Sequence, residues 1–146
     1  MWFFKNKVEP KPPFFVWSAA EHSVGVDTFD EEHQRLTAMM AQIHAALLGE
    51  HDRLRAMKLL EKLVKETRVH FTHEEDAMGE ADTPDLEAHA AEHASLIAQA
   101  EDLLRQFAQG SMSAMMFPGF LRDWLIPHMQ TYDRRYAASM RRMGLR

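Results

Sequence analysis

The chain has 146 residues, 46% of them apolar, which is enough to bury the core of one globular domain. Its 17 basic and 22 acidic residues give a formal charge of -5, and the basic residues form no long run, which argues against nucleic acid as a partner. The absence of cysteine excludes disulfides, thiolate-bound metals and iron–sulfur clusters. Any metal bound by this chain must therefore be held by histidine, aspartate and glutamate.

The first fifteen residues, MWFFKNKVEPKPPFF, predict an extended arm. Three prolines between Pro10 and Pro13 remove backbone donors and fix φ, so this stretch cannot be helical. The aromatic residues on either side, Trp2 to Phe4 and Phe14 with Phe15, either pack on the rest of the chain or bind a protein partner. No apolar run is long enough for a signal-peptide core or a membrane span. We therefore expect an arm, residues 1–15, and one domain, residues 16–146, in a cytoplasmic protein that does not bind membranes.

Beyond the arm, apolar residues recur at steps of three and four, which is typical of amphipathic helices. The first such segment ends at Gly49 and the third at Gly110. The third helix is predicted to begin with Thr83 or Asp82 as its cap and Pro84 in its first turn. The inward positions are Leu36, Met40, Ile43 and Leu47; Leu60, Leu63, Thr67, His70, Glu74 and Met78; Leu86, His89, His93, Leu96, Ala100, Leu103 and Phe107; and Phe117, Leu121, Trp124, His128 and Tyr132. The pattern shows no β alternation and predicts an all-α fold, an up-down-up-down antiparallel four-helix bundle.

Ionisable side chains interrupt these apolar stripes. Every stripe brings at least one imidazole to the inward face, and two of them bring a carboxylate. The residues concerned are His33, His70, Glu74, His89, His93, His128 and Asp133. Residues four apart share one helical face, as His70 and Glu74 do, and an ionised carboxylate is costly on a buried face without a partner. A metal ion would satisfy a carboxylate and an imidazole together.

These positions also fall at one end of an antiparallel bundle. His33 lies near the start of the first helix and Glu74 near the end of the second, while His89 begins the third and His128 is late in the fourth. Seven ligands are too many for a single four-coordinate zinc ion and suit two ions bridged by carboxylates. An imidazole-rich site of this kind favours iron, with manganese and zinc as alternatives. Five imidazoles leave one octahedral position open for a small ligand.

The spacing of these residues resembles that of the hemerythrins, in particular the bacterial ones. The segments that carry the resemblance are SVGVDTFDEEH (residues 23–33), HFTHEEDAM (70–78), HAAEH (89–93) and WLIPH (124–128), with Asp133 five residues after the last histidine. The resemblance covers roughly residues 16–137. It implies a non-haem di-iron centre, two iron ions with an oxo or hydroxo bridge, that binds O2 reversibly as a hydroperoxide at the open iron.

The resemblance also implies a role for each residue of the set. The coordinatively full iron would be held by His89, His93 and His128, and the open one by His33 and His70, with Glu74 and Asp133 bridging both. Leu125 matches the family position that faces the O2 pocket, and Phe71 and Trp124 are further candidates for its walls. On this interpretation the protein is a monomeric O2 carrier, store or delivery protein and not an enzyme.

Other functions stay open at this point. The centre could serve an O2 or redox sensor whose aromatic arm acts on a partner, or a di-iron enzyme acting on peroxide or nitric oxide. The segment from His89 to His93 also fits the H-x-x-E-H pattern of inverzincin proteases, with Glu92 as the base. That pattern needs a distant carboxylate ligand in a mixed fold, and it would leave His33, His70 and His128 buried without a role.

Pro127 is a departure from the family, and it bears on the geometry of the site. It stands directly before His128 inside the fourth helix, where it removes the backbone bond to Asp123. On a regular helix Asp133 would point about 140° away from His128. We therefore expect a bulge or kink that turns Asp133 back towards the site. The remaining acidic and imidazole groups of this region, among them His73 and Glu75, are expected on solvated faces.

Overall fold

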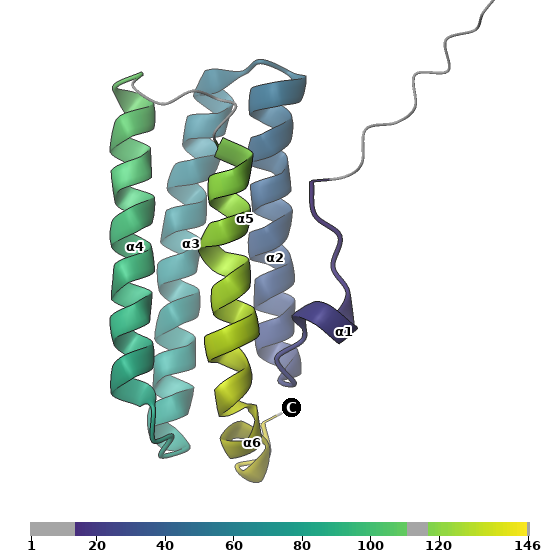
Figure 1. The fold of residues 1–146 in the computed structure, drawn as a ribbon, viewed down its shortest axis with the longest axis vertical. Helices are drawn as coiled ribbons and strands as arrows, with labels where there is room; N and C mark the ends of the chain where they lie inside the picture. Colours follow the sequence, from purple (N-terminus) through teal and green to yellow (C-terminus); the bar gives the residue numbers. More distant parts are fainter. Residues whose placement is uncertain (1–13, 111–116, 146) are drawn as a thin grey trace, which may run out of the picture.

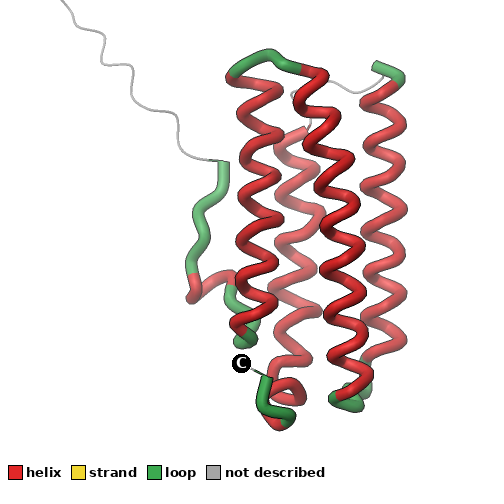
Figure 2. The backbone as a smooth tube through the Cα atoms, turned by 180° about the vertical axis from the view of Figure 1, so that it is seen from behind, coloured by secondary structure: helices red, strands yellow, loops and turns green. Residues whose placement is uncertain are grey.

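The computed structural model describes residues 14–110 and 117–145. Within these ranges the chain is helical without a β-strand, and its long helices run alternately up and down as an antiparallel four-helix bundle, as predicted (Figures 1 and 2). The elements are α1 (Ala19–His22), α2 (Asp27–His44), the π-helical turn η1 (Ala45–Gly49), α3 (Arg53–Glu80), α4 (Leu86–Ala108), α5 (Phe117–His128), the π-helical turn η3 (Met129–Asp133) and α6 (Arg134–Arg142). No helix of these residues is both long enough and apolar enough to cross a membrane.

Short polar side chains set where α2 and α3 begin. In the first turn of α2, the Asp30 carboxylate accepts hydrogen bonds from the Ser23 hydroxyl at 2.6 Å and the Val24 backbone N–H at 2.8 Å, and so holds the preceding segment against the helix. At the start of α3, the side chain of the N-cap residue Asp52 accepts from the Arg55 backbone N–H at 3.0 Å. The Asp52 cap satisfies a backbone donor that has no partner inside the helix.

The predicted start of the third bundle helix is wrong by two to three residues. The helix α4 begins at Leu86 with Asp85 as its N-cap, and Pro84 lies in the turn before it. The Thr83 backbone N–H donates to the Met78 carbonyl at 3.0 Å and thereby closes the end of α3. The Thr83 hydroxyl is buried without a hydrogen-bond partner among the described residues, so its side chain does not cap α4.

The bundle contains two apolar clusters with the ionisable residues between them. The larger one, the apolar core, includes Leu36, Met40, Ile43, Leu60, Leu63, Phe71, Leu96, Leu103, Phe107, Leu121, Trp124 and Leu125. The smaller one, the end cluster, consists of Val24, Val26, Phe29, Met78, Tyr136 and Met140. In α2, His33 lies between Phe29 of the end cluster and Leu36 of the apolar core. The polar residues are therefore enclosed by apolar side chains above and below.

Arginines of α6 join the end of the bundle to the segment before α2. The Arg134 Nε–H donates to the Ser23 carbonyl at 3.2 Å, and the Arg141 Nε–H donates to the Gly25 carbonyl at 3.3 Å. Gly25 has a φ of +84°, and a Cβ there would meet the Arg141 guanidinium, so this position requires glycine. These contacts hold α6 over the end cluster.

The described end of the arm packs on the bundle. The Phe14 ring stacks on His44 with centroids 4.9 Å apart, and the Arg122 guanidinium lies 5.1 Å from the Phe14 centroid. Phe15 and Trp17 contact the His22 ring. Trp2 to Phe4 lie outside the described residues, so a protein partner for the arm stays a prediction.

Candidate metal centre

The structure brings all seven predicted ligand residues to one level of the bundle interior. Each exposes 3% or less of its surface. They come from four different helices and the turn η3, and they are His33, His70, Glu74, His89, His93, His128 and Asp133. Their metal-binding atoms form two overlapping groups, in each of which the atoms lie within 4.8 Å of one another.

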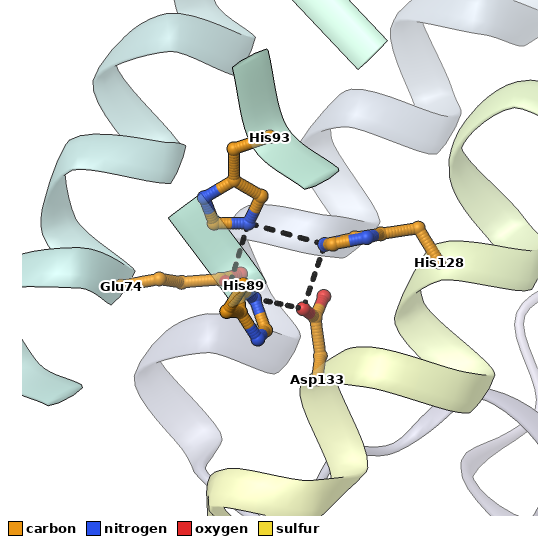
Figure 3. A group of neighbouring side chains, drawn as sticks. All are labelled: Glu74, His89, His93, His128 and Asp133. Atoms are coloured by element: carbon orange, nitrogen blue, oxygen red, sulfur yellow. Dashed lines mark hydrogen bonds and ion pairs between the residues drawn. The ribbon is translucent and has the colours of Figure 1, made fainter. Parts of the chain in front are cut away.

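The two groups share both carboxylates and differ in their number of imidazoles. One group consists of His89, His93 and His128 with the two carboxylates (Figure 3). The other consists of His33 and His70 with the same carboxylates, Glu74 and Asp133. Three imidazoles on one side and two on the other is the distribution that the sequence predicts for one full and one open ion.

Glu74 divides its two oxygens between the groups. Its Oε1 lies 3.1 Å from His33 Nε2 and also contacts His70 Nε2. Its Oε2 lies 3.3 Å from His89 Nε2 and 3.4 Å from His93 Nε2. One oxygen towards each set of imidazoles is the orientation of a carboxylate that bridges two ions.

Asp133, in the turn η3, also divides its two oxygens between the two sets of imidazoles. Its Oδ2 lies 3.1 Å from His33 Nε2, while its Oδ1 lies 3.0 Å from His89 Nε2 and 2.9 Å from His128 Nε2. The dashed lines of Figure 3 show the contacts of Asp133 with His89 and His128. Both carboxylates therefore face both groups.

The turn η3 explains how Asp133 reaches the site. The chain passes from α5 into the π-helical turn Met129–Asp133 directly after Pro127 and His128. The wider π turn accommodates an additional residue, which rotates Asp133 back to the face that carries His128. The predicted irregularity of the fourth helix is thereby confirmed, in the form of a π bulge.

The two carboxylates stay ionised although they are fully buried. Burial and the nearby Glu74 charge would raise the pKa of Asp133, but contacts with His128, His33 and His89 lower it to about 2. Burial would likewise raise the pKa of Glu74, and the surrounding imidazoles hold it well below its usual range. Two buried negative charges require a positive partner in the same cavity.

In the absence of a metal ion that partner is a set of protons on the imidazoles. Burial alone would lower the pKa of His70, but the Glu74 charge and contact with Glu32 raise it to about 10. Burial opposes the same change at His89, where contacts with Asp133 and Glu74 raise the pKa to about 9. Protonation of this kind marks the positions where a metal cation would replace protons.

Protons do not satisfy every buried atom of the site, which favours metal ions over protons. Among the described residues, both Asp133 oxygens and His70 Nε2 are buried without a hydrogen bond of good geometry. The Nε2 atoms of His93 and His128 lie 3.1 Å apart, so two lone pairs would face each other if both neutral rings carried their proton on Nδ1, and a shared cation would then satisfy both. A donor set rich in imidazole with bridging carboxylates fits a pair of iron ions.

Comparison with known proteins agrees with this geometry. Residues 24–138 match the hemerythrin HHE cation binding domain, which covers most of the chain. The chain belongs to the hemerythrin family. It is 32% identical over 122 residues to a bacteriohemerythrin of Methylococcus capsulatus, a match that covers 82% of this chain and 92% of the relative. The predicted family is thereby confirmed.

More distant members and solved structures extend the match. Myohemerythrin-1 of Phascolopsis gouldii is 25% identical over 131 residues, covering 90% of this chain and 97% of the relative. A crystal structure of wild-type hemerythrin superposes with a TM-score of 0.78 at 30% identity, covering 86% of this chain and 97% of that one. The hemerythrin bundle is therefore the fold of this chain as well as its family.

Glu32, which was not predicted from the sequence, contacts a proposed ligand of the hemerythrin site without belonging to the ligand set. It exposes only 6% of its surface. Its Oε2 accepts from His70 Nδ1 at 2.8 Å and its Oε1 accepts from His73 Nδ1 at 2.5 Å. The helical period of the sequence does place Glu32 on the inward face, because it lies three residues after Phe29 and four before Leu36. His73 was expected on a solvated face, and its side chain is 56% exposed, but its ring is held by Glu32.

Tyr136 is a second residue near the hemerythrin site that the sequence analysis did not single out. It is fully buried, and its ring centroid lies 5.7 Å from those of both His89 and Phe29. Burial and the charges of Glu74 and Asp133 raise the pKa of its hydroxyl well above the usual value. Tyr136 therefore stays neutral and is the member of the end cluster whose ring lies against His89 of the site.

The three candidates for the O2 pocket are all buried, but they differ in what they contact. Phe71 stacks on His93 with centroids 3.8 Å apart and planes 4° from parallel. Trp124 donates its Nε1–H to the Leu96 carbonyl at 2.9 Å, which fixes the indole in the apolar core. Leu125 is completely buried in the same core. Only for Phe71 does a ring contact with proposed ligands place it directly against the site.

Proposed function

We propose that this chain binds two iron ions and uses them to bind O2 reversibly. The observation that carries the proposal is the division of the Glu74 and Asp133 oxygens between two sets of imidazoles. Two carboxylates placed in this way would hold two ions in one site. One ion would be held by His89, His93 and His128 and the other by His33 and His70, with Glu74 and Asp133 shared.

The unequal number of imidazoles supports binding at one particular ion. An ion at His33 and His70 would have one protein ligand fewer than an ion at His89, His93 and His128, which would leave a position for a small molecule. When bound, the iron pair supplies the reversible transfer of electrons to O2. The five imidazoles are neutral ligands, and a site with more imidazole than carboxylate suits a mild, reversible cycle.

The protein itself contributes the exclusion of water and the fixed orientation of the ligands. Phe71 covers the His93 ring, and Leu125 and Met129 are completely buried beside the proposed ligands in the chain. We propose that Leu125, Phe71 and Trp124 form the apolar wall of the O2 pocket. A dry wall disfavours the release of charged oxygen species and so favours return of O2 itself. The proposed activity is binding and not turnover.

The test is a metal count joined to an optical spectrum. The purified full chain is reduced under anaerobic conditions, exposed to O2, and then returned to an O2-free atmosphere, with a spectrum at each stage. We expect two irons per chain and a visible charge-transfer band that appears with O2 and disappears on its removal. A His70→Ala variant, which removes a ligand of the proposed open ion, should lose this band.

Other results would replace the proposal with a different one. Two irons with a band that appears once and decays to an oxidised form would favour the sensor or enzyme interpretation. Zinc, or a single metal per chain, would contradict the di-iron proposal altogether.

A further inference from the structure

Three buried or half-buried glutamates outside the proposed ligand set share one feature of position. Each stands directly beside a proposed ligand in the sequence, yet its carboxylate turns to a histidine of a different helix. They are Glu32 next to His33, Glu75 next to Glu74, and Glu92 next to His93. The proposed function gives the last two glutamates no role, although their neighbours in the sequence are proposed ligands.

Each imidazole of the site directs its Nε2 atom towards the centre of the site. The atoms of His33, His70, His89, His93 and His128 that face the carboxylates and one another are their Nε2 atoms. An imidazole that binds a metal through Nε2 carries its proton on Nδ1, and that outward N–H needs an acceptor. Among the described residues, the buried Nδ1 atoms of His93 and His128 have no hydrogen-bond partner.

The three carboxylates approach these outward atoms in a regular order around the bundle. Glu32 of α2 accepts from His70 Nδ1 of α3 at 2.8 Å. Glu75 of α3 places Oε1 3.7 Å from the Nδ1 atom of His93 in α4. Glu92 of α4 continues this order, because its Oε1 lies 4.0 Å from the Nδ1 atom of His128 in α5.

In the described part of the chain, Glu75 and Glu92 have no competing ion-pair partner. Among the described residues, each of the two carboxylates lies within ion-pair distance of its histidine only. Arg68, a cation that lines the same surface groove as Glu75 and His93, pairs with Glu101 instead. Both glutamate side chains are 31% exposed, so a small rotation is available to bring them into hydrogen-bond distance.

We propose that Glu75 and Glu92 are positioning residues that accept hydrogen bonds from the Nδ1–H groups of His93 and His128 when the site holds metal. Glu32 already does so for His70, and the proposal extends its role to two further helices. Each such contact fixes the tautomer that presents Nε2 to the metal, and it ties two neighbouring helices together. The inference rests on the ligand set of the proposed function.

The first part of the test is metal affinity. The full chain and its variants are loaded with zinc, a diamagnetic probe, and zinc is withdrawn by a competing chelator. Glu75→Ala and Glu92→Ala should each weaken zinc binding about 10- to 100-fold. Glu75→Gln and Glu92→Gln, which keep an acceptor oxygen, should recover part of the loss. The matched controls are Asp76→Ala beside Glu75 and Glu87→Ala on α4, both exposed, which should bind like the wild type.

The second part identifies which histidine responds, and it distinguishes positioning from a general loss of stability. Imidazole ¹⁵N NMR of the zinc-loaded chain should show Nδ1–H tautomers for His93 and His128. Replacing Glu75 should change the signals of His93 only, and replacing Glu92 those of His128 only. Unchanged signals with affinities equal to the controls would overturn the inference, as would changes of both histidines in either variant. A wild-type chain that binds fewer than two zinc ions would overturn the proposed function and this inference with it.

Discussion

The apolar core and the seven proposed ligand residues are equally buried, yet they are held together by different forces. Ile43, Leu60 and Leu103 of the apolar core make non-directional contacts. Their burial stabilises the fold in proportion to the apolar surface area that is removed from water. Glu74 and Asp133 are just as inaccessible, but each depends on particular atoms at particular distances. An apolar core therefore tolerates substitutions gradually, whereas the buried ionisable residues depend on a complete set of partners.

The largest expected effect comes from removing a carboxylate shared by both groups. In Glu74→Ala, both sets of imidazoles lose an oxygen that faces them, so the bound metal should fall from two ions to none. Elemental analysis of the purified variant checks this result. Glu66→Ala, an exposed position of the same helix, is the control and should keep both ions. A Glu74→Ala chain with two irons and the native spectrum would show that this residue does not bridge.

A graded effect is expected from the apolar core. Leu60→Ala removes a side chain that is 1% exposed and should lower the free energy of unfolding by about 2–5 kcal/mol. Denaturant unfolding measures this change, and the folded variant should still bind two metal ions. Leu54→Ala, with Leu54 64% exposed in the same helix, should change the free energy of unfolding by less than about 0.5 kcal/mol. Loss of metal from folded Leu60→Ala would mean that the two regions are not independent.

A third effect concerns the pH dependence of the metal-free protein. The pKa values of His70 and His89 are raised to about 10 and about 9, so their protonated forms stabilise the fold. That contribution is complete below the unfolded pKa of about 6.5 and is lost as the pH rises through about 9 to 10. The thermal midpoint of the metal-free chain should therefore fall between about pH 7 and pH 10.5.

The acidic side of the same profile follows from Asp133. Its pKa is lowered to about 2, so its contribution is present above about pH 4 and is lost as the pH falls through about 2. Metal-loaded protein should show no fall on the alkaline side, because the ions take the place of the protons. An equal alkaline fall with metal bound would assign the pH dependence to groups outside the site.

The smallest expected effect comes from Glu32, which touches the site only through His70. Glu32→Gln keeps the shape and removes the charge, so metal affinity should fall by about tenfold while both ions still bind. Chelator competition measures the affinity. Glu31→Gln, the exposed neighbour, is the control. Identical affinities for the two variants would show that the contact of Glu32 with His70 does not support metal binding.

The parts of the site that lie on regular helices were predictable, because a spacing of four residues places two side chains on one face. His70 with Glu74 and His89 with His93 are found where this rule puts them. Asp133 follows no such rule; the resemblance to the hemerythrins and the irregularity expected at Pro127 indicated that it could reach the site. Glu32 was overlooked because its role depends on a contact with a residue 38 positions away.

Four amphipathic helices with imidazoles and carboxylates on their inward faces could be predicted from the local sequence, because those features depend on the period of the helix. The tertiary structure decided which oxygen of Glu74 and Asp133 faces which imidazole, that η3 turns Asp133 inwards, and that Thr83 closes α3. It also placed Glu75 and Glu92 against histidines of neighbouring helices. Such contacts depend on the relative rotation of packed helices, which is set by side chains far apart in the sequence.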